Sequence, residues 1–231
     1  MEAIPAAAAL SAAKPIELVP GIELSVALEH GELHLLGYYI DYTDQNLRET
    51  LARFRKVRSK RADVILAKLE EMGYPLDMEK LLPGQMHGAI GRLHIAQGLF
   101  RAGHVRTVPE AFTRLIGDGG PAYVPKIKLT ITEAMAMILN VGGLPVLAHP
   151  GQLGQDELIP ELIEMGLAGL EVYYPSHSQF EINHYEELAR YYGLIATGGS
   201  DCHGPNKNRI LMGTVTVPYT VVEELKAKTK G

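Results

Sequence analysis

The sequence contains one cysteine, Cys202, and no tryptophan among its 231 residues. A disulfide within one chain needs two cysteines, so the chain is not a disulfide-stapled secreted scaffold. No stretch approaches ~18 uninterrupted apolar residues, so we expect no membrane-spanning helix. The first residues lack the basic segment of a secretory signal peptide and include an acid, Glu2. These absences predict a cytoplasmic protein that is not embedded in a membrane.

The sequence also lacks an excess of basic residues: 22 Lys and Arg stand against 27 Asp and Glu, for a net charge of −5. Proteins that bind duplex nucleic acid usually carry a basic domain, so we do not expect such a partner. A local basic pocket remains compatible with this balance. The remaining composition, 46% hydrophobic and 21% charged, is that of a globular protein with a full core.

Two kinds of sequence pattern alternate along the chain. Residues 1–43 and 126–231 contain short apolar runs between helical periods, which predict a largely parallel sheet or barrel. Residues 44–125 show helical periods and almost no strand signal, which predicts a helical insertion. A hairpin is expected from residues 24–28 and 33–40. Further strands are expected at residues 145–149, 167–174, 194–197 and 214–217.

Polar residues with metal-binding side chains follow several of these strands. In parallel βα folds the active site collects at the C-terminal ends of the strands. The candidate ligands at or near such ends are Glu23, His34, His149, Asp201 and His203. A mixture of imidazole and carboxylate donors suits Zn, Mn or Fe better than Mg or Ca alone. Asp201 and His203 are two residues apart, so in an extended segment both would face one site.

The hairpin leaves one geometric question open. A two-residue turn at positions 30 and 31 would place Glu23 opposite Tyr38 and His34 opposite Ala27. The two candidate ligands would then lie four residues, or about 13 Å, apart, too far to share an ion. Either they bind different ions, or the hairpin is bent or differently registered.

Five short motifs carry a resemblance to a known family. They are VPGIELS at 19–25, HLLGY at 34–38, GRLHIA at 91–96, LAHP at 147–150 and GGSDCHG at 198–204. Together they resemble the PHP (polymerase and histidinol phosphatase) phosphoesterases, in the branch that acts on nucleoside 3′,5′-bisphosphates and on 5′ ends of short RNA. The resemblance covers nearly the whole chain. It implies an α/β fold, a distorted (β/α)7 barrel with a helical insertion, and hydrolase activity. It also implies two or three divalent ions, most often Mn, with Zn, Fe or Mg as alternatives. All five candidate ligands match family ligand positions.

The resemblance also has a departure. The family opens with a strand that bears His-x-His and continues with Asp-His-Asp at the next strand end, and neither motif is present here. We therefore expect an N-terminally incomplete barrel whose open edge could be covered in a homo-oligomer. Three functions stay open: an active phosphoesterase, an impaired remnant or truncated fragment that retains a metal and phosphate pocket, and a metal-dependent amidohydrolase.

Four residues are candidates for binding substrate. Arg92 and His94 match the family's Arg-x-His motif at a helix start, where side chains and helix N-terminus suit a phosphate. Arg58 and Arg61 lie one turn apart on a basic helix, for which a solvated surface is the simpler interpretation. These residues favour a phosphate over an amide, so we expect a small phosphorylated substrate, a nucleotide or a short RNA end. His177 follows another strand end and is a weaker site candidate.

Overall fold

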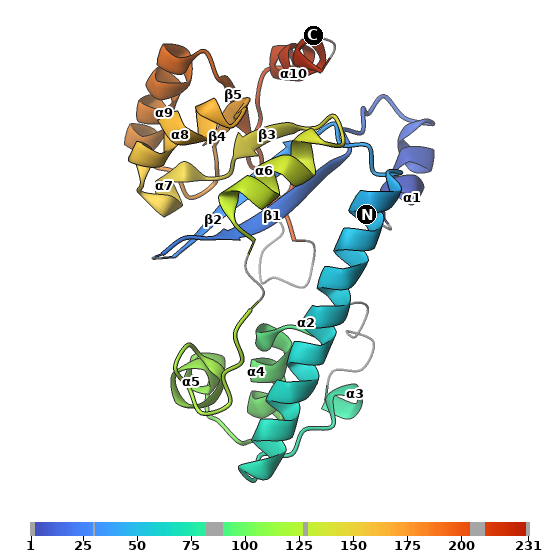
Figure 1. Cartoon of the computed structure of the whole chain (residues 1–231), viewed down its shortest axis with the longest axis vertical. Coiled ribbons are helices and arrows are strands. Elements are labelled where there is room, and N and C mark those ends of the chain that lie inside the picture. Colours follow the sequence, from blue (N-terminus) through green and yellow to red (C-terminus); the bar gives the residue numbers. More distant parts are fainter. Residues whose placement is uncertain (1–2, 30, 82–89, 127–128, 204–210, 230–231) are drawn as a thin grey trace. The chain divides into compact units, whose positions relative to one another are not determined.

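The computed structural model describes residues 3–29, 31–81, 90–126, 129–203 and 211–229. The chain divides into two compact units. Unit 1 comprises Met1–Leu47 and Lys128–Gly231, and unit 2 comprises Arg48–Ile127. Figure 1 labels the helices and strands of both. Each unit is described by itself.

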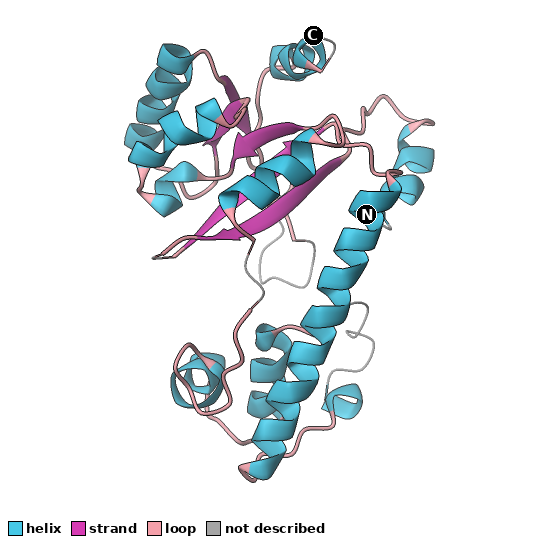
Figure 2. Ribbon diagram, viewed as in Figure 1, coloured by secondary structure: helices cyan, strands magenta, loops and turns pink. Residues whose placement is uncertain are grey.

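Unit 1 is built on a mixed sheet (Figure 2). Within its described residues the sheet has five strands, in the order β1-β2-β3-β4-β5. The strands are β1 (Gly21–Ala27), β2 (Glu32–Tyr38), β3 (Leu144–Leu147), β4 (Gly169–Tyr173) and β5 (Ile195–Gly198). β1, β2 and β3 pair antiparallel, whereas β3, β4 and β5 pair parallel. The parallel strands end at the same edge, so residues that follow β3, β4 and β5 come close to one another.

Helices follow the strands of unit 1. They are α1 (Ala3–Ser11), α6 (Ile131–Leu139), α7 (Pro150–Leu153), the 3-10 helix η2 (Asp156–Leu158), α8 (Ile159–Glu164), α9 (Gln179–Tyr192) and α10 (Thr220–Lys228). A capping box is present at Thr130, whose hydroxyl accepts a hydrogen bond from Glu133 N. Apolar side chains of the sheet and of these helices form a core, which includes the buried Leu35, Ile138 and Leu170. This core fixes the sheet on which the candidate ligands stand.

Unit 2 has its own core. Its elements are most of α2 (Gln45–Glu71), α3 (Met78–Leu81), α4 (Arg92–Arg101), α5 (Val108–Ala111) and the π-helix η1 (Phe112–Ile116). Ile65, Leu69, Ile95 and Leu99 are fully buried between these helices. No strand occurs among the described residues of this unit. Of the helices described, none is both long and apolar enough to span a membrane.

The strand predicted at residues 214–217 is wrong. Gly213 adopts a left-handed conformation, with φ of +79°. Directly after it, the amide and the hydroxyl of Thr214 both donate to Leu211 O. This local turn uses the backbone and side-chain groups that a strand would need for pairing and packing.

Candidate metal centre

The β1–β2 hairpin places Glu23 and His34 side by side. Glu23 pairs with Leu36, and His34 pairs with Ser25. The connection spans residues 28–31, so the register is shifted by two residues from that of a two-residue turn. Glu23 and His34 thereby become diagonal neighbours on one face, and Glu23 Oε1 lies 2.8 Å from His34 Nδ1. The separation of about 13 Å expected for a two-residue turn is therefore wrong, and a different register is the alternative that the structure adopts.

His149 joins this pair from the end of β3. β3 pairs with β2, and the amide of Ala148 donates to His34 O at 3.0 Å. His149 then adopts a left-handed backbone, with φ of +30° and ψ of +58°. Its Nε2 lies 3.2 Å from His34 Nδ1 and 3.7 Å from Glu23 Oε1. Strained backbone in a residue other than glycine is characteristic of functional sites.

These three donor atoms fit a single divalent ion. One atom each from Glu23, His34 and His149 lies within 4.8 Å of the others. Metal–nitrogen and metal–oxygen bonds of about 2.0–2.2 Å set ligand atoms roughly 3–3.5 Å apart, close to the observed 2.8–3.7 Å. The other ring nitrogen of His34, Nε2, lies 3.4 Å from Glu32 Oε1. A carboxylate in this position orients a metal-binding imidazole.

The charges of the site are strongly coupled. The His149 and His34 imidazoles hold the pKa of Glu23 well below its usual range. In turn, the hydrogen bond with Glu23 raises the pKa of His34 above its ordinary value. Both shifts favour an ion pair between protonated His34 and ionised Glu23. Because a metal ligand must be deprotonated, an ion entering here would displace the proton of His34.

Glu171 belongs to the site although its sequence position did not single it out. It lies on β4 and is 6% exposed, and its Oε2 accepts a hydrogen bond from His149 N at 3.0 Å. Burial raises the pKa of Glu171 to about 7. Its signal in the sequence is a single acid inside the apolar run of residues 167–173.

Asp201 and His203 lie at the end of β5 but are not part of the three-residue group that the described residues form. His203 Nδ1 lies 2.8 Å from Asp201 O and 3.3 Å from Asp201 Oδ1. The extended backbone assumed for this segment is wrong, because Asp201 is left-handed with φ of +45°. Asp201 Oδ2 instead accepts a hydrogen bond from Tyr174 Oη at 3.2 Å.

His177 is a buried structural histidine. Its Nδ1 donates to Val172 O at 2.8 Å, and its Nε2 accepts from Gly151 N at 3.2 Å. These partners define the neutral tautomer and occupy both ring nitrogens. His177 therefore ties the segment after β3 to the end of β4 and has no nitrogen left for an ion.

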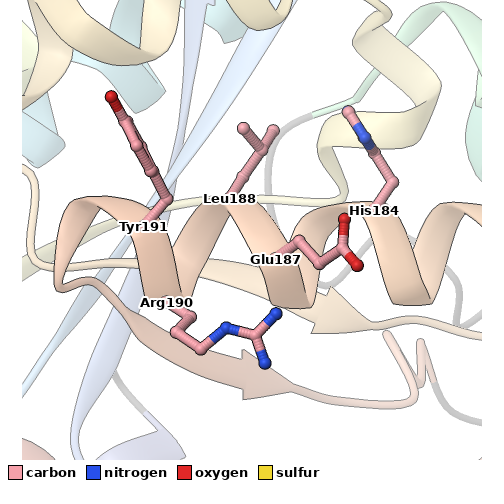
Figure 3. Close-up of a pocket in the computed structure, with 5 residues that line it drawn as sticks. All are labelled: His184, Glu187, Leu188, Arg190 and Tyr191. Atoms are coloured by element: carbon pink, nitrogen blue, oxygen red, sulfur yellow. The ribbon is translucent and has the colours of Figure 1, made fainter.

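Two hollows lie on unit 1. The one at the three-ligand group has a volume of about 280 Å³ and is lined by Glu32, Leu33, His34, Ala148, His149, Gln152 and Leu153. The larger, about 450 Å³, lies on α9 (Figure 3). All five of its lining residues, His184, Glu187, Leu188, Arg190 and Tyr191, come from that one helix. Because the metal-binding side chains converge at the smaller hollow, we place the chemistry there.

The four predicted substrate-binding residues lie in unit 2, near the start of α4. The Arg58 guanidinium packs against Gly91, where an added Cβ would lie 2.9 Å from Arg58 Nη2. Arg61 donates through Nε to Val124 O, and its Nη2 is buried without a hydrogen-bond partner. Burial, followed by the positive charge of Arg92, lowers the pKa of Arg61.

The other two predicted residues, Arg92 and His94, lie in the first turn of α4. Arg92 Nη1 lies 2.6 Å from Asp118 Oδ1, and its guanidinium lies 5.6 Å from the centre of the Tyr123 ring. His94 Nδ1 accepts from Gly91 N at 3.1 Å, which leaves Nε2 as the protonated donor of a neutral ring. The cluster thus gathers cations and a ring N–H donor.

Comparison with known proteins gives a consistent set of relatives. No family model matches the chain. It is 32% identical over 195 residues to the 5′-3′ exoribonuclease Rnm of Escherichia coli, covering 82% of this chain and 67% of that protein. It is 31% identical over 215 residues to the 3′,5′-nucleoside bisphosphate phosphatase of Chromobacterium violaceum, covering 87% and 73%. A solved structure assigned as a metal-dependent phosphoesterase from Bifidobacterium adolescentis has a TM-score of 0.80 and 26% identity, covering 97% of this chain and 81% of that one.

Proposed function

The chain belongs to the PHP-type metal-dependent phosphoesterases, and on that premise we propose that it hydrolyses phosphate monoesters of nucleotides, either 3′,5′-bisphosphates or the 5′ ends of short RNA. One observation carries the proposal. Glu23 Oε1, His34 Nδ1 and His149 Nε2 lie within 3.7 Å of one another, and the two histidines line the hollow beside β2 and β3. A phosphate ester placed in that hollow would meet both imidazoles.

In this proposal Glu23, His34 and His149 hold a divalent ion, with Mn as the first choice. Asp201 and His203 are proposed as further ligands. The bound ion would supply Lewis-acid chemistry, which polarises a phosphoryl oxygen and lowers the pKa of water. The chain's own part is to orient the ligands: Glu32 sets the ring of His34 through Nε2.

The cluster in unit 2 supports a phosphate as the group recognised. Guanidinium groups bind phosphate through paired N–H donors, and Arg61 Nη2 is a buried donor that lacks a partner. A buried donor without a partner destabilises the folded protein by about 1–3 kcal/mol. A phosphate oxygen would satisfy Arg61 Nη2, and His94 Nε2 would add a neutral donor.

The test is phosphate release from adenosine 3′,5′-bisphosphate by chain purified with Mn²⁺. We expect release that EDTA abolishes. His34→Ala should lower kcat/KM by roughly 100-fold, because loss of one ligand weakens ion binding. His184→Ala is the matched control, since His184 pairs with Asp156 and lies outside the ligand group. It should retain the wild-type rate.

The same assay separates the competing functions. Chain that binds Mn²⁺ but releases neither phosphate from the bisphosphate nor phosphate or a 5′-mononucleotide from a 5′-phosphorylated RNA trinucleotide is a binding remnant, and the proposed activity is wrong. Hydrolysis of amide substrates alone would identify an amidohydrolase. For the phosphate cluster, Arg61→Ala should raise KM roughly tenfold with a smaller change in kcat.

A further inference from the structure

Strand β4 carries none of the five predicted ligands, yet hydrogen bonds connect its C-terminal end to residues after both neighbouring strands. From Glu171 a hydrogen bond runs to His149, after β3. From Tyr174, directly after β4, a hydrogen bond runs to Asp201, after β5. β4 lies between β3 and β5 in the sheet. It can therefore set the distance between the residues on its two sides.

Glu171 is placed to act on His149. Its side chain is 6% exposed, and Oε2 accepts from His149 N at 3.0 Å. Oε1 faces Gly199, where an added Cβ would lie 3.5 Å away. A buried carboxylate is unfavourable unless it is hydrogen-bonded. The hydrogen bond from the His149 amide therefore explains how a carboxylate can be buried at position 171.

That amide belongs to a strained residue. His149 has φ of +30° and ψ of +58°, and the left-handed region is unfavourable for a residue with a Cβ. An acceptor for its N–H offsets part of this strain. Because the backbone sets the direction of the Cα–Cβ bond, it also sets where Nε2 lies, 3.2 Å from His34 Nδ1.

Tyr174 supports the same ring from another side. The centroids of the Tyr174 and His149 rings are 5.1 Å apart. The Tyr174 hydroxyl donates to Asp201 Oδ2 at 3.2 Å and lies 3.3 Å from the Gln152 Nε2 that donates to it. The ring thus contacts His149 while the hydroxyl holds the carboxylate of Asp201.

We propose that Glu171 is a positioning residue. Its carboxylate binds the backbone amide of His149 and thereby holds the His149 imidazole beside Glu23 and His34, where a divalent ion can bind. The Tyr174 ring is a second support for this imidazole. The proposal uses from the proposed function only the assignment of His149 as a ligand. The property that matters is the hydrogen-bond acceptor at position 171, because the carboxylate touches the backbone of His149.

The experiment is a titration of metal-free chain with Mn²⁺ by calorimetry, which requires no substrate. Glu171→Gln keeps an acceptor and should bind Mn²⁺ within about threefold of wild type. Glu171→Ala removes it and should bind 10–100-fold more weakly, the range for residues that orient metal ligands. Tyr185→Phe is the control: Tyr185 is 4% exposed on α9 and its hydroxyl donates to Asp156 Oδ1, so the variant loses a hydrogen bond outside the ligand group. It should bind like wild type.

Several results would overturn the proposal. Wild-type affinity in Glu171→Ala would show that the acceptor is not needed. Equal losses in Glu171→Gln and Glu171→Ala would show that the charge matters rather than the acceptor. If the wild-type chain binds no Mn²⁺, His149 has no ion to bind and the proposal is wrong. Mn²⁺ binding without phosphate release contradicts only the proposed function.

If Glu171→Ala does not fold, a pair of Tyr174 variants decides. Tyr174→Leu removes the ring that packs on His149 and should weaken Mn²⁺ binding more than Tyr174→Phe, which keeps it. Equal affinity of the two variants would overturn the role of the ring and, with it, the proposal.

Discussion

Three histidines of unit 1 show how surroundings decide what a residue does. His34 and His149 stand beside the Glu23 carboxylate with ring nitrogens facing one another. His177 has both nitrogens bound to backbone groups of Val172 and Gly151. The first two can exchange a proton for an ion, whereas the third holds two chain segments together.

This difference predicts unequal effects of alanine substitution on stability in EDTA. His177→Ala leaves Gly151 N and Val172 O without their partner and should lower the free energy of unfolding by roughly 2–4 kcal/mol. His34→Ala, at a partly exposed position, should change it by less than about 1 kcal/mol. Urea denaturation measures both. A larger loss in His34→Ala than in His177→Ala would contradict the assignment of roles.

The β1–β2 hairpin and the capped helix α6 show what single elements contribute. The hairpin register determines whether Glu23 and His34 meet, because a shift of two residues moves a side chain by about 7 Å along a strand. α6 packs on the same sheet, and its buried Ile138 touches Gly37 of β2, where an added Cβ would lie 3.0 Å from two carbons of Ile138. The stability of α6 therefore matters to the packing of unit 1.

The capping box at the start of α6 predicts a specific loss of stability. Thr130→Ala removes the acceptor of the Glu133 amide and should lower the free energy of unfolding by about 1 kcal/mol. Thr132→Ala, at an exposed position in the same turn, is the control and should be near neutral. Chemical denaturation at pH 7 would measure both, and equal losses would contradict the cap.

The second hydrogen bond of the capping box, from Thr130 N to the Glu133 carboxylate, makes the stability of the protein depend on pH. The backbone hydrogen bond from Thr130 lowers the pKa of Glu133 below its ordinary 4.5. A lowered carboxyl pKa contributes stability above the unfolded-state pKa, and this is lost as the pH falls through the folded-state value. Glu133→Ala should therefore be less stable than wild type at pH 7, and the difference should narrow below about pH 4.5.

At the scale of the whole molecule, two units with separate cores predict separable behaviour. Leu99 is fully buried in the unit 2 core, so Leu99→Ala should destabilise that unit by roughly 2–5 kcal/mol. The three grouped ligands all lie in unit 1. Mn²⁺ affinity at low temperature should therefore stay within about twofold of wild type, since sites that share no contacts act almost independently.

Phe100→Ala, on the same helix but 49% exposed, is the matched control. Limited proteolysis should cut Leu99→Ala first within residues 48–127 and leave Phe100→Ala resistant. A large loss of Mn²⁺ affinity in folded Leu99→Ala would show that the units do not behave separately.

Much of the fold could be predicted because its signals are local. Apolar runs such as PVLAH at 145–149 indicate buried strands, and Thr130-x-x-Glu133 marks a helix start. The prediction of a strand at 214–217 failed although apolar residues alternate there. The turn at Gly213 and the hydrogen bond from the Thr214 hydroxyl to Leu211 O, both at the start of this segment, favour a turn instead. Local patterns also selected Glu23, His34 and His149 as candidate ligands, because each stands at or near the end of a strand.

Only the tertiary structure decided how those residues combine. The hairpin register and the pairing of β2 with β3 bring three donor atoms within 3.7 Å, and no local pattern specifies such pairings. Glu171 became part of the site because β4 lies beside β3, where its carboxylate reaches the His149 amide. The sequence by itself determined which side chains are candidate metal ligands, since residue type and the neighbouring apolar runs are local properties. The distances between them were decided by strand pairing, which joins residues far apart in the chain.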